Sequence, residues 1–90
     1  MAKIKFTSAL KTFFPSLTDL ELDGATIRDV LNQVEMQYPG ISSYLTDETG
    51  SLRKHVNIFL QGDLIKDRSA LSDPVKRTDE LLIFQALSGG

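Results

Sequence analysis

The sequence has 90 residues, of which 41% are hydrophobic, so it is long enough for one domain with a single core and too short for a second. Ten Lys and Arg against twelve Asp and Glu leave a net charge of −2, without the basic surplus expected of a dedicated nucleic-acid binder. The absence of cysteine excludes disulfides, thiolate metal ligands and a cysteine nucleophile. No apolar run approaches the roughly 20 residues of a membrane span or the length of a signal peptide, so we expect a cytoplasmic protein. The charge balance favours proteins or small molecules as its partners.

The first part of the chain is predicted to form a β-hairpin. Residues 3–7 alternate polar and apolar side chains, as in a half-buried strand. The segment 8–18 has no sustained period and contains Pro15, which predicts a wide turn with packed aromatic side chains. Residues 19–23 alternate again and are followed by a turn glycine. The two alternating segments are therefore expected to pair.

The pattern then changes to a helical period. Thr26 is a suitable N-cap, and Asp29 follows it in capping-box spacing. Apolar residues recur at helical intervals up to a Pro-Gly pair, which predicts a helix over 27–38. One further helical turn is expected over 41–45, followed by an exposed polar loop over 47–51.

The second half of the chain contains two predicted strands and one short edge strand. Residues 55–61 form the third strand, and 64–65 form the edge strand after a Gly-containing turn. A long connection follows, in which the Leu71 and Val75 side chains are expected to be buried in the core. Residues 81–84 are apolar on both faces, which suits a strand in the middle of a sheet.

Two strands, one helix and two or three further strands predict an α+β domain of the β-grasp (ubiquitin-like) fold, a mixed sheet with one main helix across one face. The pattern also allows a ferredoxin-like fold, but only one convincing helix is present. The domain is expected to span 1–87, with 88–90 as a flexible Gly-Gly tail. The predicted core consists of Ile4, Phe6, Leu20, Leu22, Ile27, Val30, Leu31, Val34, Ile58, Leu60, Leu81 and Ile83.

Four blocks of the sequence, spread over nearly the whole chain, carry a resemblance to a known family. They are Lys3-Ile4-Lys5-Phe6, Tyr38-Pro39-Gly40-Ile41, His55-Val56-Asn57-Ile58-Phe59, and Asp79-Glu80-Leu81-Leu82-Ile83-Phe84 running to Gly89-Gly90. On these blocks the chain resembles the ubiquitin-like sulfur carrier proteins of the ThiS/MoaD type, especially the MoaD-like and CysO-like members. It departs from them in Thr78, where a turn Gly is frequent, and in Gln85, where Pro is frequent.

The resemblance implies that the chain is a protein co-substrate, not an enzyme. An E1-like enzyme would adenylate the Gly90 carboxylate with ATP, and a sulfur donor protein would then displace AMP to leave a thiocarboxylate. A biosynthetic enzyme would accept the sulfur. ATP belongs to the activating partner, because this chain has no Walker-type phosphate loop and is expected to bind no cofactor. Gly89 and Gly90 have no Cβ, so a narrow enzyme cleft can close around them.

A partner-binding surface is expected on the sheet face opposite the helix. If the helix covers Ile58 and Ile83, the alternation of side chains leaves an apolar patch on the other face. The alternative is that loop residues 8–18 or 41–54 cover these side chains. The sole histidine, His55, has neither cysteines nor paired acids to join, so no metal site is expected. The expected partner-binding residues are Phe59, Leu82, Phe84 and Leu87.

Three functions remain open at this point: a sulfur carrier, a ubiquitin-like protein modifier joined to lysines through Gly90, and a β-grasp interaction module without tail chemistry. Carrier and modifier share the activation step, so a ladder of lysine isopeptides would favour the modifier. Normal function after deletion of both terminal glycines would favour the interaction module.

Overall fold

We describe residues 1–85 of the protein from a computed structural model; the expected tail 88–90 and the expected domain end at residue 87 lie outside them. The elements follow one another as β1 (Ala2–Phe6), α1 (Ser8–Lys11), β2 (Leu20–Leu22), α2 (Ile27–Gln37), α3 (Ser42–Leu45), β3 (Val56–Leu60), β4 (Asp63–Leu64) and β5 (Glu80–Gln85). Within these residues five strands form one sheet in the order β2-β1-β5-β3-β4. Strands β1 and β5 are parallel and the other neighbours antiparallel, as in the predicted β-grasp fold.

The main helix begins and ends where the sequence predicts, to within one residue. Thr26 Oγ1 accepts a hydrogen bond from the backbone N–H of Asp29 at 3.2 Å, which satisfies one of the free donors of the first turn. The Asp29 carboxylate in turn accepts from the backbone N–H of Ala25, one residue before the position of a standard capping box. Helix α2 ends at Gln37. No helix among residues 1–85 is long and apolar enough to cross a membrane.

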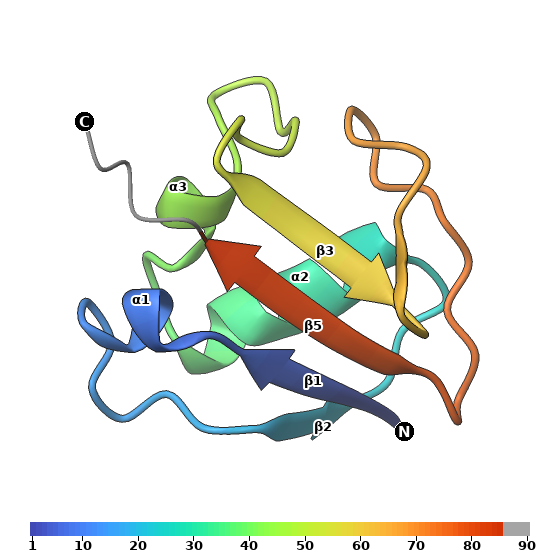
Figure 1. Ribbon diagram of the computed structural model, residues 1–90, viewed down its shortest axis with the longest axis horizontal. Coiled ribbons are helices and arrows are strands. Elements are labelled where there is room, and N and C mark those ends of the chain that lie inside the picture. The colour runs from blue at the N-terminus through green and yellow to red at the C-terminus, as the bar shows by residue number, and fades with distance from the viewer. Residues whose placement is uncertain (86–90) are drawn as a thin grey trace.

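Helix α2 crosses one face of the sheet, and in Figure 1 it lies behind β1, β5 and β3. Its buried side chains fill the space between the two layers. All of the predicted core residues are buried except Leu20 and Leu60, which are half-buried and pack against the core. The buried side chains of the helix are Ile27, Val30, Leu31 and Val34.

The connections contribute more to the core than the sequence pattern predicts. The core includes side chains from α1, α3 and the loops beside them, which have no apolar periodicity. The prediction of a wide turn over 8–18 is wrong for its first part, because residues 8–11 form the helical turn α1. A single turn is too short to show a helical period. The predicted packing of its aromatic side chains is confirmed, since Phe13 and Phe14 both pack on Tyr44. The buried side chains in these connections are Leu10, Leu17, Ile41, Leu45 and Leu52.

The edge strand is shifted by one residue from its predicted position. Gln61 and Gly62 have φ values of 52° and 85°, as in a tight two-residue hairpin turn, so pairing resumes at Asp63. Strand β4 is therefore Asp63–Leu64, not 64–65. The shift leaves the Leu64 side chain 55% exposed, whereas Ile65 is buried in the core.

The long connection before β5 is anchored to the helix. Leu71 and Val75 are buried, which confirms their predicted role. The Leu71 carbonyl accepts a hydrogen bond from the backbone N–H of Arg28 in the first turn of α2. Leu71 has a φ of 57°, which is unusual for a bulky residue. Nearby, the side-chain hydrogen bond from Ser72, together with three backbone N–H groups, lowers the pKa of Asp67 to about 2.

Candidate functional site

The candidate docking surface is the sheet face opposite α2, which we call the open face. Phe59 lies directly opposite Leu82 in the β3–β5 pairing, and Asn57 lies opposite Phe84. Phe59 and Leu82 are half-buried, and Phe84 is 38% exposed. Neither predicted loop buries these side chains, whereas their neighbours in sequence, Ile58 and Ile83, are fully buried under the helix. The apolar patch therefore lies where the alternation predicts it.

Leu64 adds a fourth apolar side chain to this face, which the predicted strand 64–65 did not include in the patch. It pairs with Phe59 across β3 and β4, and cross-strand partners project to the same side of a sheet. The one-residue shift of β4 places it there. We call Phe59, Leu64, Leu82 and Phe84 the open-face patch. The sequence signal that could have identified Leu64 is the Gln61-Gly62 pair. Read as a two-residue hairpin turn, it places Asp63 opposite Leu60 and Leu64 opposite Phe59.

The other half of the open face is charged. Lys3 of β1 pairs with Glu21 of β2 on one side and with Glu80 of β5 on the other. Lys5 Nζ lies 3.1 Å from Glu80 Oε1, and the two side chains are 43% and 52% exposed. A pair this exposed stabilises the fold by only about 0–1 kcal/mol. The open face thus joins a charged half to an apolar half, with Glu80 at the junction.

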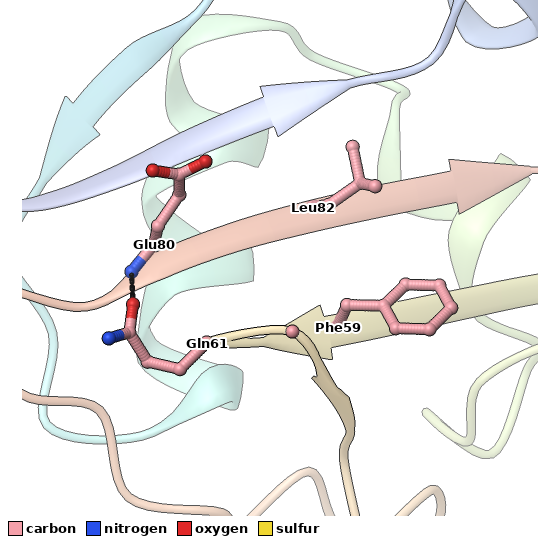
Figure 2. Close-up of a pocket in the computed structure, with 5 residues that line it drawn as sticks. Phe59, Gln61, Glu80 and Leu82 are labelled. Carbon is pink, nitrogen blue, oxygen red and sulfur yellow. Dashed lines mark hydrogen bonds between the residues drawn. The ribbon is translucent and has the colours of Figure 1, made fainter.

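A hollow of about 570 Å³ lies at this junction, lined by Phe59, Gln61, Gly62, Glu80 and Leu82. Figure 2 shows the Phe59 and Leu82 side chains at one end and the Glu80 and Gln61 side chains at the other. Gln61 Oε1 accepts from the backbone N–H of Glu80 at 2.6 Å, and the Gln61 backbone N–H donates to the Glu80 carbonyl at 2.9 Å. These two bonds hold the turn and the start of β5 together.

The last described residues of β5 are also fixed by side chains and backbone from outside the strand. The backbone N–H of Thr7 donates to the Ile83 carbonyl at 3.2 Å, and Thr7 Oγ1 accepts from the backbone N–H of Gln85 at 3.4 Å. The central strand is thus held up to Gln85. Three candidate residues, Leu87, Gly89 and Gly90, lie outside residues 1–85.

The start of β3 is fixed by one guanidinium group. Arg68 donates to the Asn57 side chain at 3.1 Å and to the carbonyl oxygens of Arg53 and Val56 at 2.7 and 2.9 Å. His55 is exposed just before this strand. Residues 1–85 contain no group of three His, Cys, Asp or Glu side chains that could hold a metal ion.

The family assignment follows from the match of the whole pattern. The model of the ThiS family matches residues 4–90. The chain belongs to the ThiS family. The match covers the four sequence blocks that carry the resemblance, except for Lys3 at the start of the first block, and it reaches the terminal glycine pair. It confirms the predicted family and, together with the solved structures below, the β-grasp fold of this ThiS-family protein.

Relatives of this ThiS-family protein carry two kinds of name. The chain is 31% identical over 72 residues to Small archaeal modifier protein 1 of Haloferax volcanii, and the alignment covers 79% of this chain and 78% of the relative. It is 30% identical over 69 residues to the sulfur carrier protein CysO of Mycobacterium tuberculosis, covering 74% of each chain. A chain in the crystal structure of the BexX/CysO complex of Amycolatopsis orientalis has a TM-score of 0.85 and 26% identity, with full coverage of both chains.

Proposed function

We propose that the protein is a sulfur carrier whose Gly90 carboxylate is adenylated by an E1-like enzyme and converted to a thiocarboxylate. The observation that supports this most is the family match, which runs to Gly89 and Gly90. The 30% identity to the sulfur carrier CysO supports it further. In this role the protein is a co-substrate, and ATP, the sulfur donor and the sulfur acceptor belong to partner proteins.

The chemistry requires activation before sulfur can enter. A carboxylate resists attack because it would have to expel oxide or hydroxide. When a carboxylate oxygen attacks the α-phosphorus of ATP, pyrophosphate leaves and an acyl-adenylate forms. Hydrosulfide, or sulfur of the same oxidation level delivered by the donor protein, then attacks the carbonyl carbon and AMP leaves. The products are a C-terminal thiocarboxylate, AMP and pyrophosphate, so no further reductant is needed.

The order of β5 up to Gln85 supports this proposal, because it gives a docking partner a rigid strand to bind. Strand β5 is hydrogen-bonded on both sides, by β1 and by β3, and is held up to Gln85 by Thr7. A partner that binds the open face therefore binds β5, the strand that precedes the C-terminal residues in the sequence. Fixing a reacting group close to its cosubstrate removes much of the entropic cost of the reaction.

The test is the intact mass of the protein after incubation with ATP, hydrosulfide and a purified E1-like enzyme from the same organism. We expect one oxygen to be replaced by sulfur, and fragmentation should place the change on the C-terminal residue. Omission of ATP is the control and should leave the mass unchanged. No mass change with any E1-like enzyme of that organism would contradict the proposal.

A second candidate function is covalent protein modification, which the 31% identity to Small archaeal modifier protein 1 favours. The same acyl-adenylate would form, but a lysine amine of a target protein would supply the nucleophile and create an isopeptide bond. Mass spectrometry of cell extracts distinguishes the two. A Gly-Gly remnant on target lysines after digestion indicates modification, and a free thiocarboxylate indicates sulfur transfer.

The open-face patch should contribute strongly to binding of the E1-like enzyme. Replacing Phe59 or Phe84 by Glu should raise the KM for the carrier roughly 30-fold or more, because large apolar side chains at an interface centre often dominate binding. The measurement is the rate of ATP-dependent thiocarboxylate formation at varied carrier concentration.

Phe13→Glu is the matched control for these two substitutions. Phe13 is 50% exposed, stacks on Tyr44 at a centroid distance of 4.8 Å, and is not one of the four residues of the open-face patch. The Phe13→Glu substitution should leave the KM for the carrier nearly unchanged. If folded Phe59→Glu and Phe84→Glu proteins react like the wild type, the patch has no role in docking.

A further inference from the structure

The hollow on the open face has an apolar end and an acidic end. Phe59 and Leu82 form the apolar end, and Glu80 is the only charged residue among the five that line it. The hollow is open to solvent on the sheet surface, whereas a small-molecule site would enclose most of its ligand. Its shape and lining therefore suit side chains presented by a protein partner.

Gln61, at the acidic end of the hollow, makes two hydrogen bonds to the backbone of Glu80. Its Oε1 is the acceptor for the Glu80 backbone N–H at 2.6 Å, and its own backbone N–H is bonded to the Glu80 carbonyl. Gln61 therefore fixes the backbone of Glu80 and leaves the Glu80 carboxylate as the charged group that an incoming side chain meets. This carboxylate favours a cation with hydrogen-bond donors.

Lys5 already occupies one oxygen of that carboxylate, at 3.1 Å, in a pair whose two side chains are about half exposed. Such a pair is weak in water, since the ions gain little by leaving their hydration shells. A partner's guanidinium or ammonium group that is brought in by an apolar contact beside it can compete with Lys5. Lys5 then acts as an internal competitor for the same carboxylate.

We propose that the activating partner places an apolar side chain against Phe59 and Leu82 and a neighbouring basic side chain against Glu80, with Lys5 weakening this contact by competition. This inference rests on the proposed function, because it names the chemistry of the partner segment that docks on the open face. Glu80 is then a specificity-determining residue, and it acts in binding and not in the chemistry at Gly90.

The test uses two charge changes with effects of opposite sign. Glu80→Gln should raise the KM for the carrier about tenfold, the size of a lost hydrogen bond to a charged group. Lys5→Gln should lower the KM about twofold, since it removes a weak competitor. The value of kcat should stay unchanged in both proteins, because the proposed contact acts in docking and not in the chemistry at Gly90.

Three further measurements separate this effect from changes in folding or overall charge. Glu21→Gln removes one negative charge from the same sheet face without touching the hollow, and it should leave the KM unchanged. Added salt should raise the KM of the wild type more than that of Glu80→Gln. In the Lys5→Gln background, Glu80→Gln should still raise the KM, which excludes exposure of an unpaired Lys5 as the sole cause.

Failure of the inference is distinct from failure of the proposed function. A wild-type protein that forms no thiocarboxylate overturns the proposed function, and the inference falls with it. A reactive wild type with equal KM values for Glu80→Gln and Glu21→Gln overturns the inference alone. A lower KM for Glu80→Gln also overturns it, because the partner then presents an acidic group to Lys5.

Discussion

Adding one alanine after Gly90 should abolish thiocarboxylate formation while the free energy of unfolding stays unchanged. The extension converts the Gly90 carboxylate into an amide and moves the new carboxylate one residue further from the docked domain. An amide offers no oxygen anion to attack ATP, and the displaced carboxylate lies out of reach of the phosphorus. Since reaction depends on placement of the reacting group, the measured rate should fall to background. Intact mass after incubation with ATP, hydrosulfide and the E1-like enzyme gives the result.

Gly90→Ala is the control for this experiment. It keeps the carboxylate in place and adds only a methyl group, so it should slow the reaction without abolishing it. Urea unfolding of all three proteins should give the same midpoint. An extended protein that gains sulfur as fast as the wild type would show that Gly90 is not the reacting residue.

Ile83→Ala should lower the free energy of unfolding by about 2 to 5 kcal/mol, the usual cost of truncating a buried aliphatic side chain. Ile83 is fully buried on β5, which pairs with β1 on one side and β3 on the other. Because Ile83 is fully buried in the core, its truncation leaves a cavity that the surrounding side chains fill only in part. Small domains have only about 5 to 15 kcal/mol of stability, so this is a large share of the total.

Leu82→Ala is the matched control, because Leu82 is the next residue of β5 and projects to the open face. It is half-buried and should cost clearly less. Urea unfolding with linear extrapolation measures both changes. Equal losses would mean that the two faces of β5 are packed alike, which the burial of Ile83 and the exposure of the open-face patch contradict.

Much of the fold could be predicted because its elements have clear local patterns. The period of the apolar residues changes from two to 3.6 after Thr26, and α2 follows within one residue of its predicted bounds. Residues 81–84, apolar on both faces, lie in β5 at the centre of the sheet. The alternation in 55–61 also predicts which side chains of β3 face the helix.

The parts that could not be predicted depend on contacts between distant segments. Leu10 and Leu45 are buried because α1 and α3 fold back onto the core, and segments this short show no period of their own. Leu64 joins the open-face patch because a two-residue turn sets the register of β4. The proposed roles of Gly89 and Gly90 in the chemistry, and of Leu87 in partner binding, stay predictions.

The sequence was sufficient for the family, the β-grasp fold and the apolar residues Phe59, Leu82 and Phe84, since these follow from local periodicity and from motifs along the chain. The folded arrangement was needed to bring Gln61 and Glu80 together at one hollow and to place Lys5 beside Glu80. Lys5 comes from β1, Gln61 from the turn after β3 and Glu80 from β5. No local sequence pattern therefore predicts that these residues lie close together. Their proximity arises from strand register, which long-range pairing sets and local pattern does not.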